Sequence, residues 1–163
     1  MDFAEKILPR AALASWREKL RQAGRRLVVT NGCFDVLHLG HVTYLQQARA
    51  QGDVLLVGLT SDDGVRTLKG PNRPLNGEQD RAGILAALQA VDAVHIFPEL
   101  DARVFLQAVQ PDVYVKGGDY TLDNINQDER RLLEGMGVRI VILPAVPGRS
   151  TSALLQRMNL YAS

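Results

Sequence analysis

The sequence predicts a single α/β domain built on a doubly wound, five-stranded parallel sheet. The chain has 163 residues, which is about the length of one domain. Short apolar runs alternate along it with stretches of helical periodicity, and this alternation is typical of parallel βαβ units. The run at 54–59 is almost continuously apolar, as expected for a strand that is buried on both faces of a sheet.

An N-terminal helical arm, residues 1–26, is expected to precede a domain spanning 27–163. Apolar residues recur at helical spacing from Ala11 to Leu20, and Gly24 ends the pattern. Basic residues suit the C-terminal end of a helix. Three arginines are therefore interpreted as its solvated end rather than as phosphate contacts: Arg21, Arg25 and Arg26.

The remaining elements alternate strand with helix. Strands are expected at 27–30, 54–59, 93–97, 113–115 and 138–143. Helices are expected at 41–51, 78–90, 102–109, 127–136 and 151–158. The polar stretch 61–77, with Gly70, Pro71 and Pro74, is predicted as the longest loop, and loops of that length are usually functional or mobile.

The composition excludes several classes of protein. The formal net charge is +1, so there is no bulk field for a nucleic acid or an anionic membrane. The single cysteine, Cys33, excludes an intrachain disulfide framework and a cysteine-rich zinc site. No apolar run is long enough to span a membrane, and no signal-peptide core is found. We therefore expect a cytoplasmic enzyme or binding protein with no nucleic-acid or membrane partner.

The segment after the first strand carries the strongest chemical signal. Neither a G-x-G-x-x-G fingerprint nor a P-loop is present. Instead the chain reads His38-x-Gly40-His41 where the first expected strand passes into a helix. A helix N-terminus offers free N–H groups to phosphate, two imidazoles add donors, and Gly40 allows close approach. Zinc ligation is not expected, because His95 is the only other histidine.

Residues 31–41, with this His-x-Gly-His element, resemble the signature of the nucleotidyltransferase superfamily that includes the glycerol-3-phosphate cytidylyltransferases. The closer resemblance is to the heptose-1-phosphate adenylyltransferases, which make ADP-heptose for lipopolysaccharide. It covers about residues 27–158 and implies a Rossmann-like domain in its stand-alone form. It rests on four further stretches: Val42-x-Tyr44-Leu45, 68–74 (LKGPNRP), 115–120 (VKGGDY) and 148–152 (GRSTS).

The resemblance implies ATP and a sugar 1-phosphate as substrates, Mg²⁺ bound with ATP, and a homo-oligomer. It assigns catalytic roles to His38, His41 and Lys69. The residues expected to bind the nucleotide are Asn31, Gly32, Cys33, Phe34, Gly40, Lys116, Gly117, Asp119, Ser150, Thr151 and Ser152. The residues expected to bind the acceptor are Asp35, Asp62, Arg73 and Arg81. No protein-held metal site is expected.

Several of these residues have a plainer interpretation. Asp35 holds the turn, contacts the acceptor or contacts metal-bound phosphates, and the sequence does not choose among these. Cys33 is interpreted as a packed side chain rather than a redox group. A helical arginine such as Arg81 is ordinarily on the surface. For the other polar positions the alternatives are helix capping or a glycine-rich turn: Asp62, Asp119, Ser150, Thr151 and Ser152.

The cytidylyltransferase relatives carry an arginine several residues before the serine that corresponds to Ser150. The present chain has Ala145 or Val146 at that place. This departure disfavours a cytidylyltransferase and leaves the role of Arg149 open.

Three alternatives to the heptose enzyme remain. They are another small-molecule nucleotidyltransferase, a class I aminoacyl-tRNA synthetase relative, and a non-catalytic nucleotide-binding module. The synthetase lacks support, because neither a Lys-Met-Ser-Lys-Ser element nor a basic excess is present.

Overall fold

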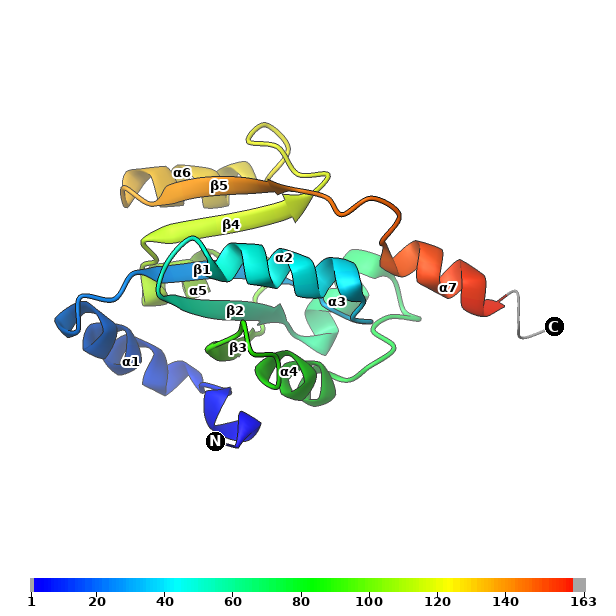
Figure 1. The fold of residues 1–163 in the computed structure, drawn as a ribbon, viewed down its shortest axis with the longest axis horizontal. Helices are drawn as coiled ribbons and strands as arrows, with labels where there is room; N and C mark the ends of the chain where they lie inside the picture. The colour runs from blue at the N-terminus through cyan, green and yellow to red at the C-terminus, as the bar shows by residue number, and fades with distance from the viewer. Residues whose placement is uncertain (1, 160–163) are drawn as a thin grey trace.

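A computed structural model describes residues 2–159 and contains one five-stranded sheet in which every strand pair is parallel (Figure 1). The strand order is β3-β2-β1-β4-β5. The strands are β1 Leu27–Gly32, β2 Val54–Thr60, β3 Ala93–Phe97, β4 Val113–Gly118 and β5 Arg139–Pro144. The predicted doubly wound α/β fold is confirmed.

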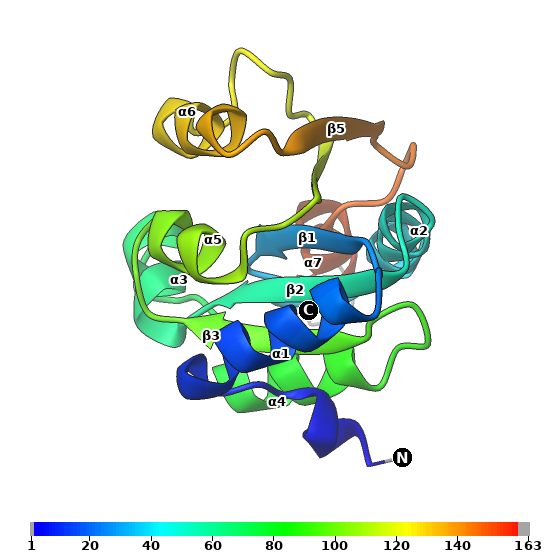
Figure 2. The ribbon, with the colours of Figure 1, turned by 90° about the vertical axis from the view of Figure 1, so that its left-hand side faces the viewer.

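Helices cover both faces of this sheet (Figure 2). Side chains from α1, α5 and α6 pack on one face, and side chains from α2 and α4 pack on the other. The helices are η1 Phe3–Lys6, α1 Arg10–Gln22, α2 Leu39–Arg49, α3 Asp62–Lys69, α4 Glu78–Ala86, α5 Arg103–Val109, α6 Gln127–Gly135 and α7 Thr151–Asn159.

The predicted loop at 61–77 is wrong in its first half, because α3 occupies it. The Ser61 hydroxyl caps the helix by accepting a hydrogen bond from the Gly64 N–H at 3.2 Å. Acidic residues lie in the first turn of α3 and basic residues in its last, as the helix dipole favours. The helix buries little besides Val65, so its sequence is mostly polar and looks like a loop.

Successive residues of the central strands alternate between two hydrophobic clusters. Leu27 and Val29 face the helices of the α1 side, whereas Val28 faces the α2 side. Both sides are apolar, because each face of the sheet is covered. This is why the strand sequences are continuous apolar runs rather than alternating ones.

Aspartates mark the amino edge of the sheet, where three strands begin. Asp53, Asp92 and Asp112 each stand directly before a strand. The Asp92 carboxylate accepts from the Leu55 N–H, and the Asp112 carboxylate accepts from the Leu27 N–H, both at 2.7 Å. Strand N–H groups at this edge are thus satisfied by side chains of the neighbouring segment.

The N-terminal arm packs against the same core. Leu13 and Leu20 of α1 are buried in the cluster on the α5 side. Upstream of α1, Ile7 forms a parallel bridge with Val94 on the outer edge of β3. Lys6 donates to the carbonyl of Val91 at 2.8 Å. The arm therefore covers an edge of the sheet that would otherwise be free.

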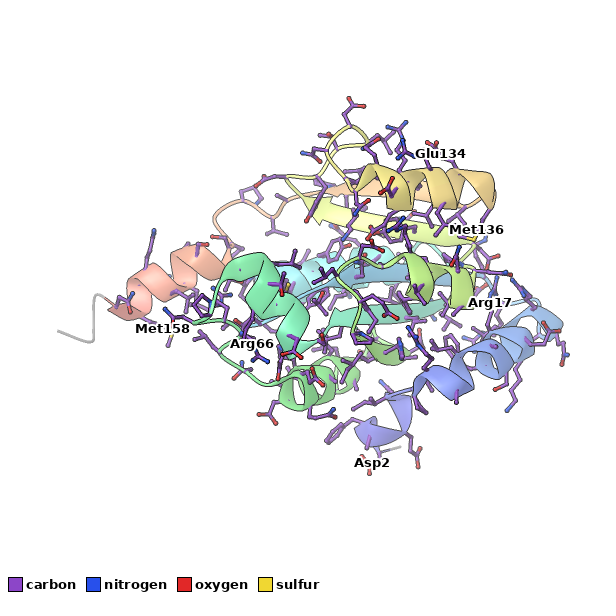
Figure 3. All side chains as sticks on the ribbon, turned by 180° about the vertical axis from the view of Figure 1, so that it is seen from behind. Asp2, Arg17, Arg66, Glu134, Met136 and Met158 are labelled. Carbon is purple, nitrogen blue, oxygen red and sulfur yellow. The ribbon has the colours of Figure 1, made fainter. Side chains whose placement is uncertain are left out.

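Helix α7 lies at the opposite end of the molecule from Arg17 of α1. In Figure 3 the labelled Met158 of α7 and Arg17 lie on opposite sides of the molecule. No residue of α7 is buried, whereas Arg17 is only 4% exposed. The sheet core therefore forms without α7, whose first turn approaches the carboxyl edge of the sheet.

Gly58 of β2 should not tolerate a side chain. A Cβ at this position would lie 2.5 Å from Cε1 of Phe105, inside a close-packed core. We expect Gly58→Ala to lower the free energy of unfolding by about 1–3 kcal/mol, as overpacking does. Urea unfolding measures this. Gly135→Ala is the control, because a Cβ there meets nothing within 4 Å; equal losses in both variants would contradict the packing argument.

Candidate active site

The carboxyl ends of β1 and β4 meet where the chain connections of the sheet diverge. β1 lies between β2 and β4. The helix that follows β1 covers one face of the sheet, and the helix that follows β4 covers the other. Ligands of such sheets bind outside the strand ends at this switch point. The two ends are in contact, because Nζ of Lys116 donates to the Asn31 carbonyl at 3.1 Å.

Two histidines stack on each other at the start of α2. The ring centroids of His38 and His41 are 4.0 Å apart, and their planes are inclined by 30°. The backbone N–H of His38 donates to Nδ1 of His41 over 3.4 Å. In a neutral His41 ring the proton therefore resides on Nε2. That Nε2–H donates no hydrogen bond within residues 2–159 and is left for a ligand.

Gly40 lies between these histidines because no side chain fits there. A Cβ would stand 2.8 Å from Cε1 of His38 and 2.9 Å from Cβ of Arg149. Close approach of a phosphate to Gly40 stays a prediction. The same packing places Arg149, whose role the sequence left open, directly against the His-x-Gly-His turn.

Both histidines are neutral near pH 7. Burial, together with the nearby charges of His38 and Lys69, lowers the pKa of His41 to about 4. Burial also lowers the pKa of His38, assisted by the charge of Arg149. The charged groups that shift these two pKa values are all positive, and none of them is a carboxylate. The site therefore combines neutral N–H donors with cationic side chains, an arrangement that suits phosphate.

Phe34 shapes the turn that leads from β1 to these histidines. It is 8% exposed and has a positive φ of 44°, which is uncommon for a residue other than glycine. Its ring lies 5.5 Å from that of His41 and packs over Gly32. Phe34 thus supports the histidine from the side, and its contacts are with protein groups.

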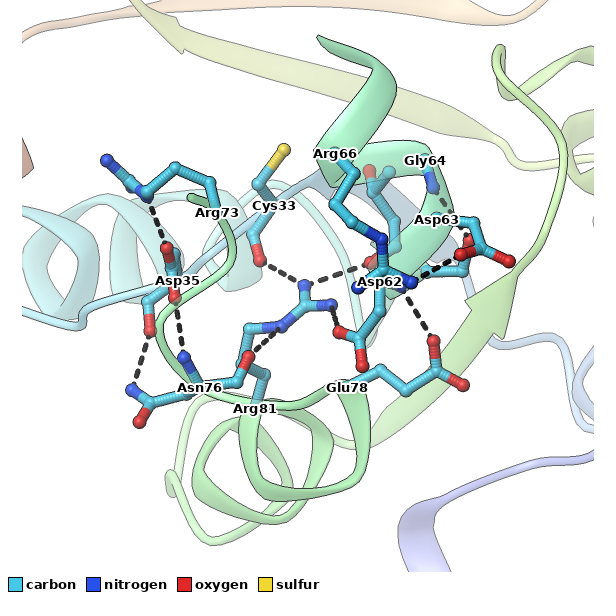
Figure 4. Close-up of polar contacts among 12 residues, drawn as sticks. Cys33, Asp35, Asp62, Asp63, Gly64, Arg66, Arg73, Asn76, Glu78 and Arg81 are labelled. Atoms are coloured by element: carbon cyan, nitrogen blue, oxygen red, sulfur yellow. Dashed lines mark hydrogen bonds and ion pairs between the residues drawn. The ribbon is translucent and has the colours of Figure 1, made fainter. Parts of the chain in front are cut away.

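Asp35 joins the same turn to the segment after α3. Its carboxylate accepts from Nε of Arg73 at 2.6 Å and from the Asn76 N–H at 3.0 Å (Figure 4). It also accepts from the Leu75 N–H at 2.8 Å. Burial acts to raise the pKa of Asp35, but these donors outweigh it and hold the pKa below its ordinary value. Of the roles left open for Asp35, the contacts favour holding the turn.

Arg81 is buried beneath this turn, so the ordinary surface position for a helical arginine is wrong here. It is 1% exposed. Its guanidinium donates to the carbonyls of Cys33 at 2.6 Å, Thr60 at 2.9 Å and Asn76 at 3.0 Å (Figure 4). Its remaining nitrogen pairs with Asp62 at 2.8 Å. Arg81 therefore ties together the ends of β1 and β2, and its contact with an acceptor stays a prediction.

The other predicted residues frame the switch point. Gly117 lacks room for a Cβ because the ring of Tyr44 lies against it, and Gly118 has a φ of 82°. Asp119 is exposed at the end of β4. Cys33 is half-buried, without a disulfide partner. At the start of α7, Ser150 caps the helix by accepting from the Ala153 N–H at 3.1 Å.

Thr151 links α7 to the histidine turn, since its hydroxyl donates to the carbonyl of Val36 at 3.4 Å. Ser152 is exposed beside it. A phosphate contact by the 150–152 segment stays a prediction. Arg149, which the sequence motifs leave without a role, also belongs to this site, and its position directly before Ser150 is the sequence signal that points to it.

Other features of the chain add no second centre of this kind. In residues 2–159 no group of three His, Cys, Asp or Glu side chains is arranged to hold a metal ion. No helix in that range is long and apolar enough to cross a membrane. A hollow of about 430 Å³ lies between the Ile7–Arg10 segment and β3, lined partly by His95. None of the predicted site residues lines it.

Replacement of Arg81 by lysine should destabilise the fold. Lysine keeps the charge but cannot present a planar fork to three carbonyls and a carboxylate. Leaving these groups buried without a partner should cost about 3–5 kcal/mol of unfolding free energy. Arg131→Lys is the control, because the side chain of Arg131 is 73% exposed. Comparable urea midpoints for both variants would refute the assigned role of Arg81.

Titration of the histidines tests the electrostatics of the site. The C–H resonances of His41 should report a pKa of about 4 in the free protein. Between pH 4 and 6.5 the unfolded chain binds the extra proton, so this group stabilises the fold above that window and the contribution is lost as pH falls. Added ATP should raise the pKa of His41, because a nearby anion favours imidazolium. A pKa near 6.5 in the free protein would exclude this environment.

Comparison with known proteins agrees with this geometry. Residues 29–158 match the family model described as cytidylyltransferase-like. The chain is 45% identical over 158 residues to the bifunctional protein HldE of Syntrophotalea carbinolica. It is 48% identical over 158 residues to the bifunctional protein HldE of Geotalea uraniireducens. Each alignment covers 97% of this chain and 32% of the relative, so the chain spans about a third of their length.

A solved structure shares the fold. It is the lipopolysaccharide core biosynthesis protein from Thermoplasma volcanium GSS1, with a TM-score of 0.63 and 27% sequence identity. The alignment covers 76% of this chain and 98% of that one. The family match covers the sheet and the histidine turn described above. The chain therefore belongs to the cytidylyltransferase-like family of nucleotidyltransferases.

Proposed function

We propose that this chain transfers AMP from ATP to D-glycero-D-manno-heptose 1-phosphate, giving ADP-heptose and pyrophosphate. The observation that carries the proposal is the stacked, neutral pair His38 and His41 at a helix N-terminus beside cationic side chains. The relatives named HldE and the neighbour named for lipopolysaccharide core biosynthesis support the choice of acceptor. So do the motifs that resemble the heptose-1-phosphate adenylyltransferases.

The proposed reaction is a direct in-line displacement. A phosphate oxygen of the acceptor attacks the α-phosphorus of ATP and forms a new P–O bond. The bond between the α-phosphorus and the bridging oxygen breaks, and its electron pair leaves with pyrophosphate. The acceptor phosphate is already an anionic nucleophile, so no covalent enzyme intermediate is required. The protein contributes positioning and stabilisation of developing charge.

The site residues take distinct parts in this reaction. The Nε2–H of His41 and the free N–H groups at the start of α2 would donate to the α- and β-phosphates, with His38 beside them. Lys69 and Arg149 would neutralise the remaining charge. Lys69 ends α3 just before Gly70, whose φ is 99°. The lysine is exposed and can swing over the phosphates.

The acceptor would bind near Arg73 and Asp62, on the other side of the turn that carries the two histidines. Arg73 uses only its Nε on Asp35, so its terminal nitrogens are available for the acceptor phosphate. Asp62 pairs through one carboxylate oxygen with Arg81, and its side chain is 29% exposed. We therefore assign acceptor contacts to Arg73 and Asp62, held in place from behind by Asp35 and Arg81. The homo-oligomer stays a prediction.

Mg²⁺ would enter with the nucleotide. The carboxylate of Asp35 is engaged by three N–H donors, so it offers no free ligand. Mg²⁺ commonly keeps several waters and binds through substrate phosphates. The donor set of the site thus fits an ion held mainly by ATP, whose charge would assist pyrophosphate departure.

The deciding experiment is pyrophosphate release with Mg²⁺ and D-glycero-D-manno-heptose 1-phosphate, using ATP and CTP in parallel and both anomers of the sugar. Turnover with ATP well above CTP is the expected result. Preference for CTP, or turnover only with glycerol 3-phosphate, would favour another member of the superfamily. ATP binding with no turnover on any acceptor would favour a non-catalytic nucleotide-binding module.

Loss of the His41 ring should abolish most of this activity. We expect His41→Ala to lower kcat by about 10²–10³, as removal of one transition-state donor does, with an unchanged unfolding transition. His95→Asn provides the control. His95 lies on β3 outside the site, and its Nδ1 bonds the Leu8 carbonyl at 2.8 Å, a position that the amide nitrogen of asparagine can occupy. Near-normal turnover by His41→Ala would refute the mechanism.

A further inference from the structure

A buried hydrogen-bond network lies directly behind the nucleotide side of the site, on the α5 and α6 face of the sheet. The hydroxyl of Tyr114 on β4 contacts Oδ1 of Asn31 at 2.6 Å and Oε2 of Glu129 at 3.3 Å. Tyr114 is fully buried and Glu129 is 6% exposed. Neither residue belongs to a motif that the sequence analysis assigned to the site.

The hydroxyl has one proton and two possible acceptors. Burial and the nearby charge of Glu129 raise the pKa of Tyr114 well above its usual value, so the hydroxyl stays protonated. The contact of 2.6 Å with Oδ1 of Asn31 is ideal for an O–H···O bond, whereas 3.3 Å to Glu129 is long. The proton therefore belongs to the bond with Asn31.

This bond fixes which end of the Asn31 amide faces the site. With Oδ1 accepting from Tyr114, the amide NH₂ is the end that remains. Asn31 is half-buried at the carboxyl end of β1, and its Nδ2 has no hydrogen-bond partner in residues 2–159. A rotation of the amide by 180° would present an acceptor to the site and turn the NH₂ toward Tyr114, whose hydroxyl proton would then have only the long 3.3 Å contact with Glu129.

The network is anchored at both ends. Oε1 of Glu129 accepts from the Ala102 N–H at 2.8 Å, in front of α5. Lys116 bonds the Asn31 carbonyl at 3.1 Å, and its ammonium lies 5.9 Å from the centroid of the Tyr114 ring. Thus the main chain and the side chain of Asn31 are both held by residues of β4.

We propose that Tyr114 is a positioning residue for nucleotide binding, which acts by holding the Asn31 amide with its NH₂ directed at the ATP phosphates or ribose. Tyr114 itself does not touch the ligand. The proposal rests on the proposed function for the identity of the nucleotide. It does not depend on which acceptor is used, because the network serves the nucleotide half of the site.

The test is the affinity for Mg·ATP without any acceptor, measured by isothermal titration calorimetry. Tyr114→Phe removes the hydroxyl and keeps the ring, so the core stays filled. We expect its Kd for ATP to rise about 3- to 10-fold, the range that the loss of one hydrogen bond gives. In turnover the change should appear in KM for ATP and leave kcat within about two-fold.

A double-mutant cycle separates positioning from a general loss of structure. Asn31→Ala alone should weaken ATP binding by a similar factor, and Tyr114→Phe added to it should cause little further loss. Tyr44→Phe is the matched control. The Tyr44 hydroxyl is also engaged within the sheet core, contacting Oγ1 of Thr30 at 2.6 Å and the Val115 carbonyl at 3.0 Å. It makes no bond to Asn31, so its effect should add fully to that of Asn31→Ala.

Additive effects of Tyr114→Phe and Asn31→Ala, or an unchanged Kd in Tyr114→Phe, would overturn the proposal. If Tyr114→Phe does not fold, the contact between Asn31 and ATP is tested by NMR on the wild-type protein. The side-chain NH₂ resonances of Asn31 should then shift with ATP saturation, and their constancy would refute the contact. Absence of heptose turnover with normal ATP binding would overturn the proposed function while this test still stands.

Discussion

The site depends on a single buried guanidinium. The Arg81 guanidinium donates hydrogen bonds to three main-chain carbonyls: one after the end of β1, one at the end of β2 and one in the segment after α3. It also forms an ion pair with the carboxylate of Asp62. Parallel strands expose such carbonyls wherever the chain leaves the sheet, and burying them without a partner is costly. Because the histidine turn and the acceptor segment are both fastened to Arg81 and Asp35, they keep one relative position.

Rigidity of this kind suits a reaction in which the protein supplies no nucleophile. A neutral His41 fixed by the His38 N–H presents its own N–H in one direction, so little reorganisation is needed as charge develops. Positive charge is left to Lys69, on an exposed helix end, and to Arg149. The arrangement separates the directional donors, which are half-buried and held in place, from the charges of Lys69 and Arg149, which are exposed to solvent.

The strands and the histidine turn could be predicted from the sequence, because an apolar strand buried on both faces and a His-x-Gly-His element are local patterns. The five strands and the position of the histidine pair after the first strand were predicted and match the structure. Helix α3 was missed because it buries few apolar side chains. The burial of Arg81 could not be foreseen, since its partners Cys33 and Thr60 are 48 and 21 residues away along the chain. Likewise, nothing local joins Tyr114 to Glu129.

The two edges of the sheet carry side chains of opposite charge: aspartates satisfy N–H groups at the amino edge, and cationic side chains satisfy carbonyls at the carboxyl edge. At the amino edge, aspartates before the strands accept strand N–H groups, and arginines such as Arg17 and Arg49 pair with these aspartates. Asp92 and Asp112 are thus ion-paired within the protein. At the carboxyl edge, Arg81 and Lys116 donate to main-chain carbonyls. The N–H groups of Leu39 and Gly40, in the first turn of α2, donate no hydrogen bond within residues 2–159. An edge whose acceptors are satisfied and whose donors are not attracts anions, which is the requirement for binding a nucleoside triphosphate.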